Sequence, residues 1–347
     1  MFTILGLLGL MAAGVAADLV LTGRDDDDAD DDLRSDGKND TTDEPDPDAS
    51  SLLDEDAESQ GSGSENTDGI VLSDDQEDAP ALDETIGGTA SADALSGNGG
   101  NDLIDGLVGD DLIDGRAGDD RIDGGEGNDA VWAGAGDDTV QGGAGADSLH
   151  GQNGDDSLEG NFGDDFLAGH FGADTLLGGA GADTLFGGAD ADSLDGGGDA
   201  DWLAGGDGDD RLDGGTGADT LDGNAGDDRL SGLQGEVDDF HEDFLNGGTG
   251  NDSLILGAGD HGHGGDGADE FVLHDWLAEG GVAHVSDYSA ADDKLVVVYD
   301  PTVHPDPVLS VNLSGDGTES TLMLDGSPVA ILRGDPVDPA VVDLRAA

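Results

Sequence analysis

The sequence has no cysteine, few aromatic residues and very few cationic ones. Aromatic side chains make up 4% of its 347 residues, and 10 Lys and Arg stand against 83 Asp and Glu, for a formal net charge of -73. The absence of cysteine excludes disulfides, and the shortage of aromatics argues against a large packed core. A surface this negative excludes nucleic acid as a partner, and it would repel itself unless bound cations neutralised many carboxylates.

Two segments of contrasting composition precede the glycine-rich part of the chain. Residues 1–21 are apolar apart from Asp18 and are typical of a targeting element. A cleaved signal peptide ending in small residues and a membrane anchor with Gly9, Ala13 and Ala17 four apart both fit, and they stay open as alternatives. Membrane contact is expected only through this segment, if it is not cleaved. Residues 22–86 are Asp-rich with few apolar residues, which predicts a disordered acidic linker.

A nine-residue period runs from Gly87 to Leu230 without a slip. Each unit follows Gly-Gly-x-Gly-x-Asp-x-U-x, with U aliphatic, and sixteen units fit end to end. The register breaks over Ser231 to Leu245 and resumes at two later units, so the predicted array covers residues 87–271. The aspartates of all these units are Asp93, Asp102, Asp111, Asp120, Asp129, Asp138, Asp147, Asp156, Asp165, Asp174, Asp183, Asp192, Asp201, Asp210, Asp219, Asp228, Asp252 and Asp269.

The repeat predicts an all-β coil of glycine turns and minimal strands, with two units in each coil. Glycines permit positive φ and a close approach of backbones, and the x-U-x residues are enough for a short strand with U facing inward. Aspartates eighteen residues apart then share an edge, with Asp93 and Asp111 on one side and Asp102 and Asp120 on the other. Sixteen units would make eight coils.

Such a stack needs a bound cation. One buried aliphatic side chain per nine residues is too little to offset the entropy lost when nine backbones are ordered. Asp carboxylates and turn carbonyls are oxygen donors of the kind that Ca²⁺ accepts, whereas Mg²⁺ demands a stricter octahedron. We therefore expect several calcium ions between stacked turns, with all eighteen aspartates as ligands and with folding coupled to binding.

These residues resemble the repeats-in-toxin family, also called hemolysin-type calcium-binding repeat proteins, across Gly87 to Phe271. The resemblance implies a right-handed parallel β-roll, Ca²⁺ held by the turn aspartates and carbonyls, and export by bacterial type I secretion machinery to the cell exterior. The stretch Val285 to Tyr299 looks like the segment that follows such arrays, and Val341 to Ala347 is similar to an uncleaved C-terminal export signal. The apolar N-terminus departs from the pattern, so anchoring in the cell envelope stays an alternative to secretion.

Some turns depart from the repeat. The third turn glycine is replaced by Ser91, Asp190 and Asp199, and the first by Ala133. Asp tolerates left-handed conformations better than Ala, so the unit at Ala133 is the one most in doubt. Residues 272–347 carry short β-branched runs over 294–299, 308–313, 321–324 and 329–332, which predict a small β-meander cap.

No catalytic signature stands beside the array, so we expect a binding or structural protein and not an enzyme. His241-Glu242 lacks the second histidine of a zinc-protease helix, and no Gly-x-Ser-x-Gly elbow occurs. His261 and His263 are either a transition-metal pair or surface histidines in a broken repeat, and Ser231 to Leu245 is either a partner-binding loop or a tolerated bulge.

Aromatic residues raise one further alternative. The side chains of Trp132, Phe162, Phe171 and Trp202 could form a sugar-binding face, against the plainer interpretation that they cover the sides of a thin roll. The corresponding functions are a structural or adhesive role with an unknown glycan or protein partner, or a carbohydrate-active or carbohydrate-binding accessory module of an extracellular enzyme system.

Overall fold

A computed structural model describes residues 82–233, 239–274 and 281–347. The predicted targeting segment and residues 22–81 of the predicted linker lie outside the described residues. The chain divides into two compact units, and every described residue belongs to the second, Glu65–Ala347. In the described ranges, no helix is long and apolar enough to cross a membrane.

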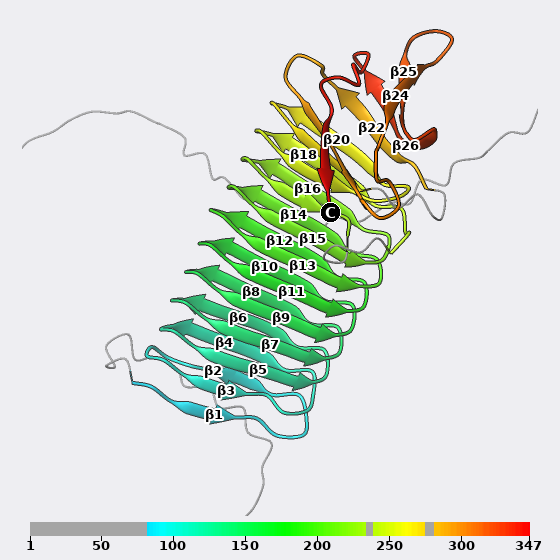
Figure 1. Ribbon diagram of the computed structural model, residues 1–347. Coiled ribbons are helices and arrows are strands. Elements are labelled where there is room, and N and C mark those ends of the chain that lie inside the picture. Colours follow the sequence, from blue (N-terminus) through cyan, green and yellow to red (C-terminus); the bar gives the residue numbers. More distant parts are fainter. Residues whose placement is uncertain (1–81, 234–238, 275–280) are drawn as a thin grey trace, which may run out of the picture. The chain divides into compact units, whose positions relative to one another are not determined.

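The described chain forms two β-sheets that receive its strands alternately as far as β24 (Figure 1). The first sheet, sheet A, holds β1 (Thr85–Gly87), β3 (Leu103–Asp105), β5 (Arg121–Glu126), β7 (Thr139–Ala144), β9 (Ser157–Phe162), β11 (Thr175–Ala180), β13 (Ser193–Gly198), β15 (Arg211–Thr216), β17 (Arg229–Ser231), β19 (Ser253–Leu256), β21 (Glu270–His274), β23 (Lys294–Tyr299) and β27 (Asp343–Ala346). The second sheet, sheet B, holds β2 (Ala94–Ser96), β4 (Leu112–Ala117), β6 (Ala130–Ala135), β8 (Ser148–Asn153), β10 (Phe166–Phe171), β12 (Thr184–Ala189), β14 (Trp202–Asp207), β16 (Thr220–Ala225), β18 (Phe244–Thr249), β20 (His261–Asp266), β22 (Ala283–Tyr288), β24 (Leu309–Leu313), β25 (Glu319–Leu324) and β26 (Ser327–Gly334).

Two repeat units make one coil, as the sequence predicts. Strands eighteen residues apart pair in parallel and in register, for example Thr175 with Ser193 and Leu176 with Leu194. About ten coils follow one another between residues 85 and 273. The all-β, parallel β-roll prediction is therefore confirmed, and the first strand begins two residues before the predicted start of the array.

The core is a single file of aliphatic side chains between the two sheets. Each unit contributes its U residue, and Leu149, Leu158, Leu167 and Leu176 are 0% exposed. The residues on either side of U point outward, because side chains alternate along a strand. The roll has no second layer of core, so backbone ladders and turns must supply the remaining stability.

The turns reach left-handed backbone conformations at their second and fourth positions. Asp190 and Asp199 replace glycine at the fourth position with φ of 77° and 75°, which confirms that Asp is tolerated there. Ala133 keeps its turn in register, because β6 pairs with β4 and β8 across it. The doubtful unit is therefore folded like its neighbours.

The register break is absorbed without loss of either sheet. Phe244 of β18 pairs with Thr220 of β16, twenty-four residues earlier instead of eighteen. At the next coil Gly262 takes the place of the inward aliphatic residue, and a Cβ there would lie 2.8 Å from the Leu256 Cδ1 atom. The core file is thus continued by a side chain from the neighbouring strand.

The C-terminal region forms a cap, and only part of this cap is a β-meander. Strands β24, β25 and β26 are antiparallel, as predicted, but β22 and β23 continue the parallel sheets of the roll. Strand β27, within the predicted export tail, pairs in parallel with β23. The sequence did not predict β22 or β27 as strands. Leu295, Leu322 and Leu332 join the core cluster of the roll, so the cap closes its C-terminal end.

Candidate metal sites along the two turn columns

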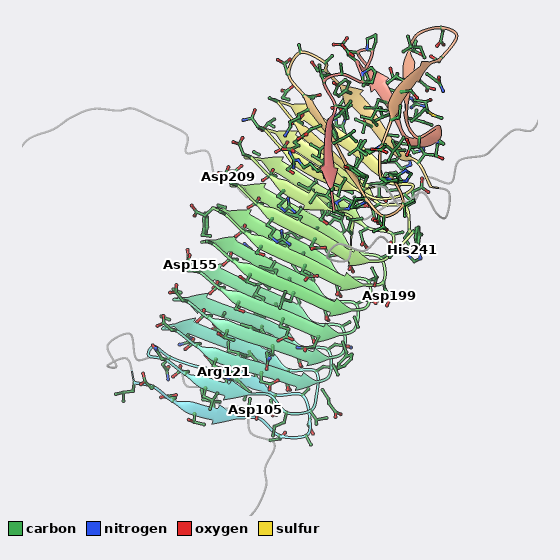
Figure 2. All side chains as sticks on the ribbon, in the orientation of Figure 1. Asp105, Arg121, Asp155, Asp199, Asp209 and His241 are labelled. Atoms are coloured by element: carbon green, nitrogen blue, oxygen red, sulfur yellow. The ribbon has the colours of Figure 1, made fainter. Side chains whose placement is uncertain are left out.

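The structure places the repeated aspartates in two columns, one along each edge of the roll. In each column the backbone N–H of one aspartate donates to the Oδ1 of the next aspartate, one coil further on. Asp138 donates to Asp156 at 2.8 Å in one column, and Asp147 donates to Asp165 at 2.8 Å in the other. In Figure 2, Asp155 and Asp209 lie beside one column and Asp199 beside the other. The two edges predicted from the eighteen-residue spacing are therefore present.

The second carboxylate oxygen in these columns is buried and has no hydrogen-bond partner. This holds for sixteen of the eighteen predicted aspartates: Asp102, Asp111, Asp120, Asp129, Asp138, Asp147, Asp156, Asp165, Asp174, Asp183, Asp192, Asp201, Asp210, Asp219, Asp228 and Asp252. Asp93 differs, because its Oδ2 accepts the Thr89 N–H at 2.6 Å. Burying an acceptor without a partner is unfavourable, so an orphan oxygen repeated in this way points to a missing positive group.

A small cradle lies next to the orphan oxygen wherever the first turn position is glycine, which excludes the unit at Ala133. A Cβ added to Gly124 would lie 2.6 Å from Asp129 Oδ2 and 2.7 Å from the carbonyl oxygen of Gly142, one coil further on. Two oxygen acceptors thus converge on a space that the missing side chain of a first-position glycine leaves open. These separations are close to those at which oxygen ligands hold Ca²⁺. The donor set fits a hard cation that tolerates irregular coordination.

Side chains alone do not make a metal cage here. Among the described residues, no group of three or more His, Cys, Asp or Glu side chains is arranged to hold a metal ion. Each turn offers a carboxylate, and the remaining donors are backbone carbonyls such as that of Gly142. Such a mixed set suits Ca²⁺, which accepts backbone oxygens, better than Zn²⁺, which requires His, Cys or carboxylate side chains.

Burial makes the charged form of these carboxylates unfavourable in the folded chain. It raises the pKa of Asp156 to about 7, of Asp201 to about 8 and of Asp243, which lies in the same column as Asp201, to about 9. The hydrogen bond from the preceding aspartate lowers each pKa, and neighbouring carboxylates in the column raise it further. The negative charge of the column carboxylates must therefore be neutralised, either by protons or by bound cations.

We expect acid to replace calcium in part. A carboxyl group whose pKa is higher in the folded state than in the unfolded state stabilises folding as pH falls through the folded value. In chelator, the β-signal in circular dichroism should rise between about pH 8 and about pH 4, because folded pKa values near 7 stand above the ordinary value of 3.8. In calcium the opposite trend is expected, because protons compete for the same oxygens. A β-signal that does not change with pH in chelator would contradict the raised pKa values of the column aspartates.

The columns contain three aspartates that the sequence analysis missed: Asp243, Asp260 and Asp293, whose Oδ1 accepts the Asp269 N–H at 3.1 Å. Asp219 N–H donates to Asp243 Oδ1 at 2.8 Å, and Asp243 N–H donates to Asp260 Oδ1 at 3.2 Å. The signal for Asp243 was present, because Asp243-Phe244-Leu245 repeats the Asp-x-U spacing after the break. Asp260 lacks that signal, since Gly262 stands where U belongs.

A second ladder, also missed, uses the residue just before a column aspartate where that residue is Asp or Asn. Its side chain accepts from a backbone N–H one coil further on, as when Asp137 Oδ1 accepts from Asp155 and Asp155 Oδ1 accepts from Ala173. These carboxylates are exposed. The two ladders run in opposite directions, so neighbouring coils are linked both ways. The frequent Asp or Asn at this variable position was the signal.

Adjacent aspartates in one turn provide a matched test of the column. Replacing Asp156 with Asn leaves an acceptor for Asp138 but removes the buried negative charge, and calcium binding at that turn should weaken by at least about tenfold. The control Asp155→Asn removes an exposed charge and keeps an acceptor for Ala173, so its effect should stay within about twofold. Equilibrium dialysis of calcium against the folded chain measures both. Equal losses in the two variants would show that bulk charge, and not the column, holds the ions.

The structure only partly brings together the other candidate sites, namely the aromatic face, the histidine pair and the insertion. Trp132 and Trp202 lie on sheet B, whereas Phe162 and Phe171 end strands of different sheets, so the four do not form one face. His261 contacts Glu242 at 2.7 Å, and His263 contacts Asp287 at 2.9 Å. The insertion is tied to the roll where Gly217 N–H donates to Asp239 at 2.7 Å, and residues 234–238 within it lie outside the described part.

The fold and its columns define a parallel β-solenoid with repeated candidate cation sites in its turns. The model of the RTX calcium-binding nonapeptide repeat matches residues 82–113, 96–131, 105–140, 132–167, 168–203 and 204–236. Residues 82–236 are accordingly an array of RTX-type calcium-binding repeats.

Two other comparisons add little. No curated protein matches the chain. The crystal structure of the extracellular lipase LipA from Serratia marcescens is similar at 16% identity and a TM-score of 0.19, over 78% of this chain and 41% of the lipase. The chain thus spans less than half the length of that lipase, and a likeness this low carries nothing about activity.

Proposed function

We propose that this chain is secreted or displayed at the cell surface and that its roll folds when calcium binds between stacked turns. The observation that carries the proposal is the double file of buried, unpartnered Asp Oδ2 atoms. The eighteen predicted aspartates, together with Asp243 and Asp260, would hold the ions with the carbonyls of first-position glycines. When bound, calcium supplies the positive charge that the columns lack.

Export fits this scheme on physical grounds. Calcium sites of the extracellular grade bind in the millimolar range, so they stay empty inside a cell and fill outside it. The chain would then pass out through a type I secretion channel while unfolded and would fold on release. The described residues hold no catalytic constellation that we recognise, which favours a structural, adhesive or ligand-binding role.

Calcium affinity and location test the proposal together. We expect a folding midpoint of roughly 0.1 to 1 mM calcium by circular dichroism. We also expect the protein in the culture medium or on the cell surface in fractionated cultures. A nanomolar midpoint, or retention of the whole protein inside cells, would contradict it.

A carbohydrate-binding role is the second candidate. One specific observation favours it: a groove lies between aromatic and polar side chains on sheet B.

A further inference from the structure

Sheet B carries a column of rings on its outer face. Aromatic and histidine side chains follow one another from strand to strand, with ring centroids 5.5 Å apart for Trp132 and His150 and 4.8 Å apart for Phe186 and Trp202. The column resumes further on, where Phe244 stacks on His261 at 4.9 Å with an interplanar angle of 14°. Alternate repeat units thus place their rings on one sheet of the roll.

The ring column is interrupted at one strand. Thr220 pairs with Trp202 on one side and with Phe244 on the other, so the two rings are separated by a single small residue. Strands lie about 4.8 Å apart, which leaves about 9.6 Å between the two ring-bearing strands. A flat ring placed over Thr220 would lie about 4.8 Å from each, within the range of favourable aromatic contacts. Trp202 and Phe244 are 39% and 50% exposed, so the slot between them is open to solvent.

A polar wall faces this slot. Asp222, Asn246 and His263 occupy successive strands in register, two residues after Thr220, Phe244 and His261 on the same strands. Asn246 Nδ2 donates to Asp222 Oδ1 at 2.8 Å, and His263 Nδ1 lies 3.1 Å from the Ser286 hydroxyl. These bonds hold the polar groups in fixed orientations along one side of a groove.

The groove is large enough for an extended ligand. It encloses about 600 Å³ and runs from Trp202 on β14 past Phe244 and His261 to Arg333 on β26. Five strand spacings separate β14 and β26 in the sheet, or roughly 24 Å. A second hollow of about 480 Å³ shares Trp202 and Asp222 and extends past Phe186. The space therefore suits a linear molecule lying across the strands.

We propose that this groove binds a neutral, linear oligosaccharide, with one sugar ring in the slot over Thr220. Sugar rings have apolar faces that pack on aromatic rings and hydroxyl rims that hydrogen-bond to carboxylate, amide and hydroxyl groups. The net charge of -73 opposes polyanionic glycans. A peptide cannot add as a strand here, because the strands that form the floor are already paired on both sides.

The inference rests on the proposed function only in that the groove requires a folded roll. Circular dichroism in the binding buffer distinguishes a failure of the proposed function from a failure of this inference. An unfolded chain in millimolar calcium overturns the proposed function, whereas a folded chain without glycan binding overturns this inference alone.

Calorimetry of the full chain in millimolar calcium, with neutral hexasaccharides of glucose, mannose and N-acetylglucosamine as probes, tests the groove. We expect at least one to bind, and Trp202→Ala to weaken that binding by roughly tenfold or more. The matched control Phe162→Ala removes a ring that is 68% exposed but lies at the end of β9 in the other sheet, and it should leave affinity unchanged.

A second variant guards against loss of fold. Thr220→Phe supplies the missing ring of the column, so the roll should stay folded while the slot is filled and binding is lost. Absence of binding to all three probes by the folded wild-type chain would overturn the inference. So would binding that Thr220→Phe leaves intact, or binding of hexalysine in their place, which would assign the groove to a cationic peptide.

Discussion

Removal of calcium is expected to unfold the whole roll. The two columns bring sixteen buried carboxylate oxygens without partners into files. Within the described ranges no Lys or Arg pairs with them, because the ion pairs of these cations involve other carboxylates, such as Asp114 and Glu270. Because a ligand that binds only the folded state stabilises it by mass action, chelation removes that stabilisation at every turn at once. The β-signal should disappear, and the radius of gyration should rise roughly twofold.

Circular dichroism and small-angle scattering in chelator, followed by return to millimolar calcium, measure this transition. Magnesium at the same ionic strength is the control, and it should restore little structure because its coordination is stricter. Identical spectra in chelator and in calcium would show that the columns are satisfied without a cation.

A single methyl group in one turn is expected to have the next largest effect. Gly163 stands at the fourth turn position with φ of 128°, and a Cβ there would overlap the carbonyl oxygen of Gly145, one coil earlier. Gly163→Ala therefore combines backbone strain with a backbone clash that no side chain can relieve, and it should destabilise the roll by roughly 3 to 5 kcal/mol. Denaturant unfolding at fixed calcium gives the value.

The matched control is Gly198→Ala, at the third turn position. A Cβ there would meet the Thr216 Oγ1 atom at 3.4 Å, an ordinary contact, and the backbone φ is not in the left-handed region. Ala180 and Thr216 already occupy the same place one coil before and after. The change should stay within about 1 kcal/mol. Comparable losses in both variants would mean that glycine content, and not position, determines stability.

The regular part of this fold is predictable because one short pattern repeats the same physical constraints. The period assigns each U residue to the core and each aspartate to an edge, so Leu176 and Asp174 are placed correctly without any knowledge of the fold. The two columns follow from the eighteen-residue spacing alone.

Prediction fails where the pattern is interrupted. Asp260 enters its column although Gly262 replaces the core residue, because Leu256 from a neighbouring strand fills that space. Strand β22 was missed because its pairing with β20 and β26 is set by tertiary contacts that no local period reveals. The orphan oxygens and their cradles are likewise invisible in sequence, since they depend on how one coil meets the next.

Because successive units of the array belong to alternate sheets, an even and an odd change in the number of units have different consequences. Removing or inserting eighteen residues in the regular array would keep every later strand in its own sheet, and the rings of Phe166, Phe186 and Trp202 would stay on one face. A change of nine residues would keep the period and the core file, yet it would send all later units to the opposite sheet. Repeat number can therefore vary freely in pairs, while a single unit gained or lost between Phe186 and Trp202 would split the ring column between the two faces.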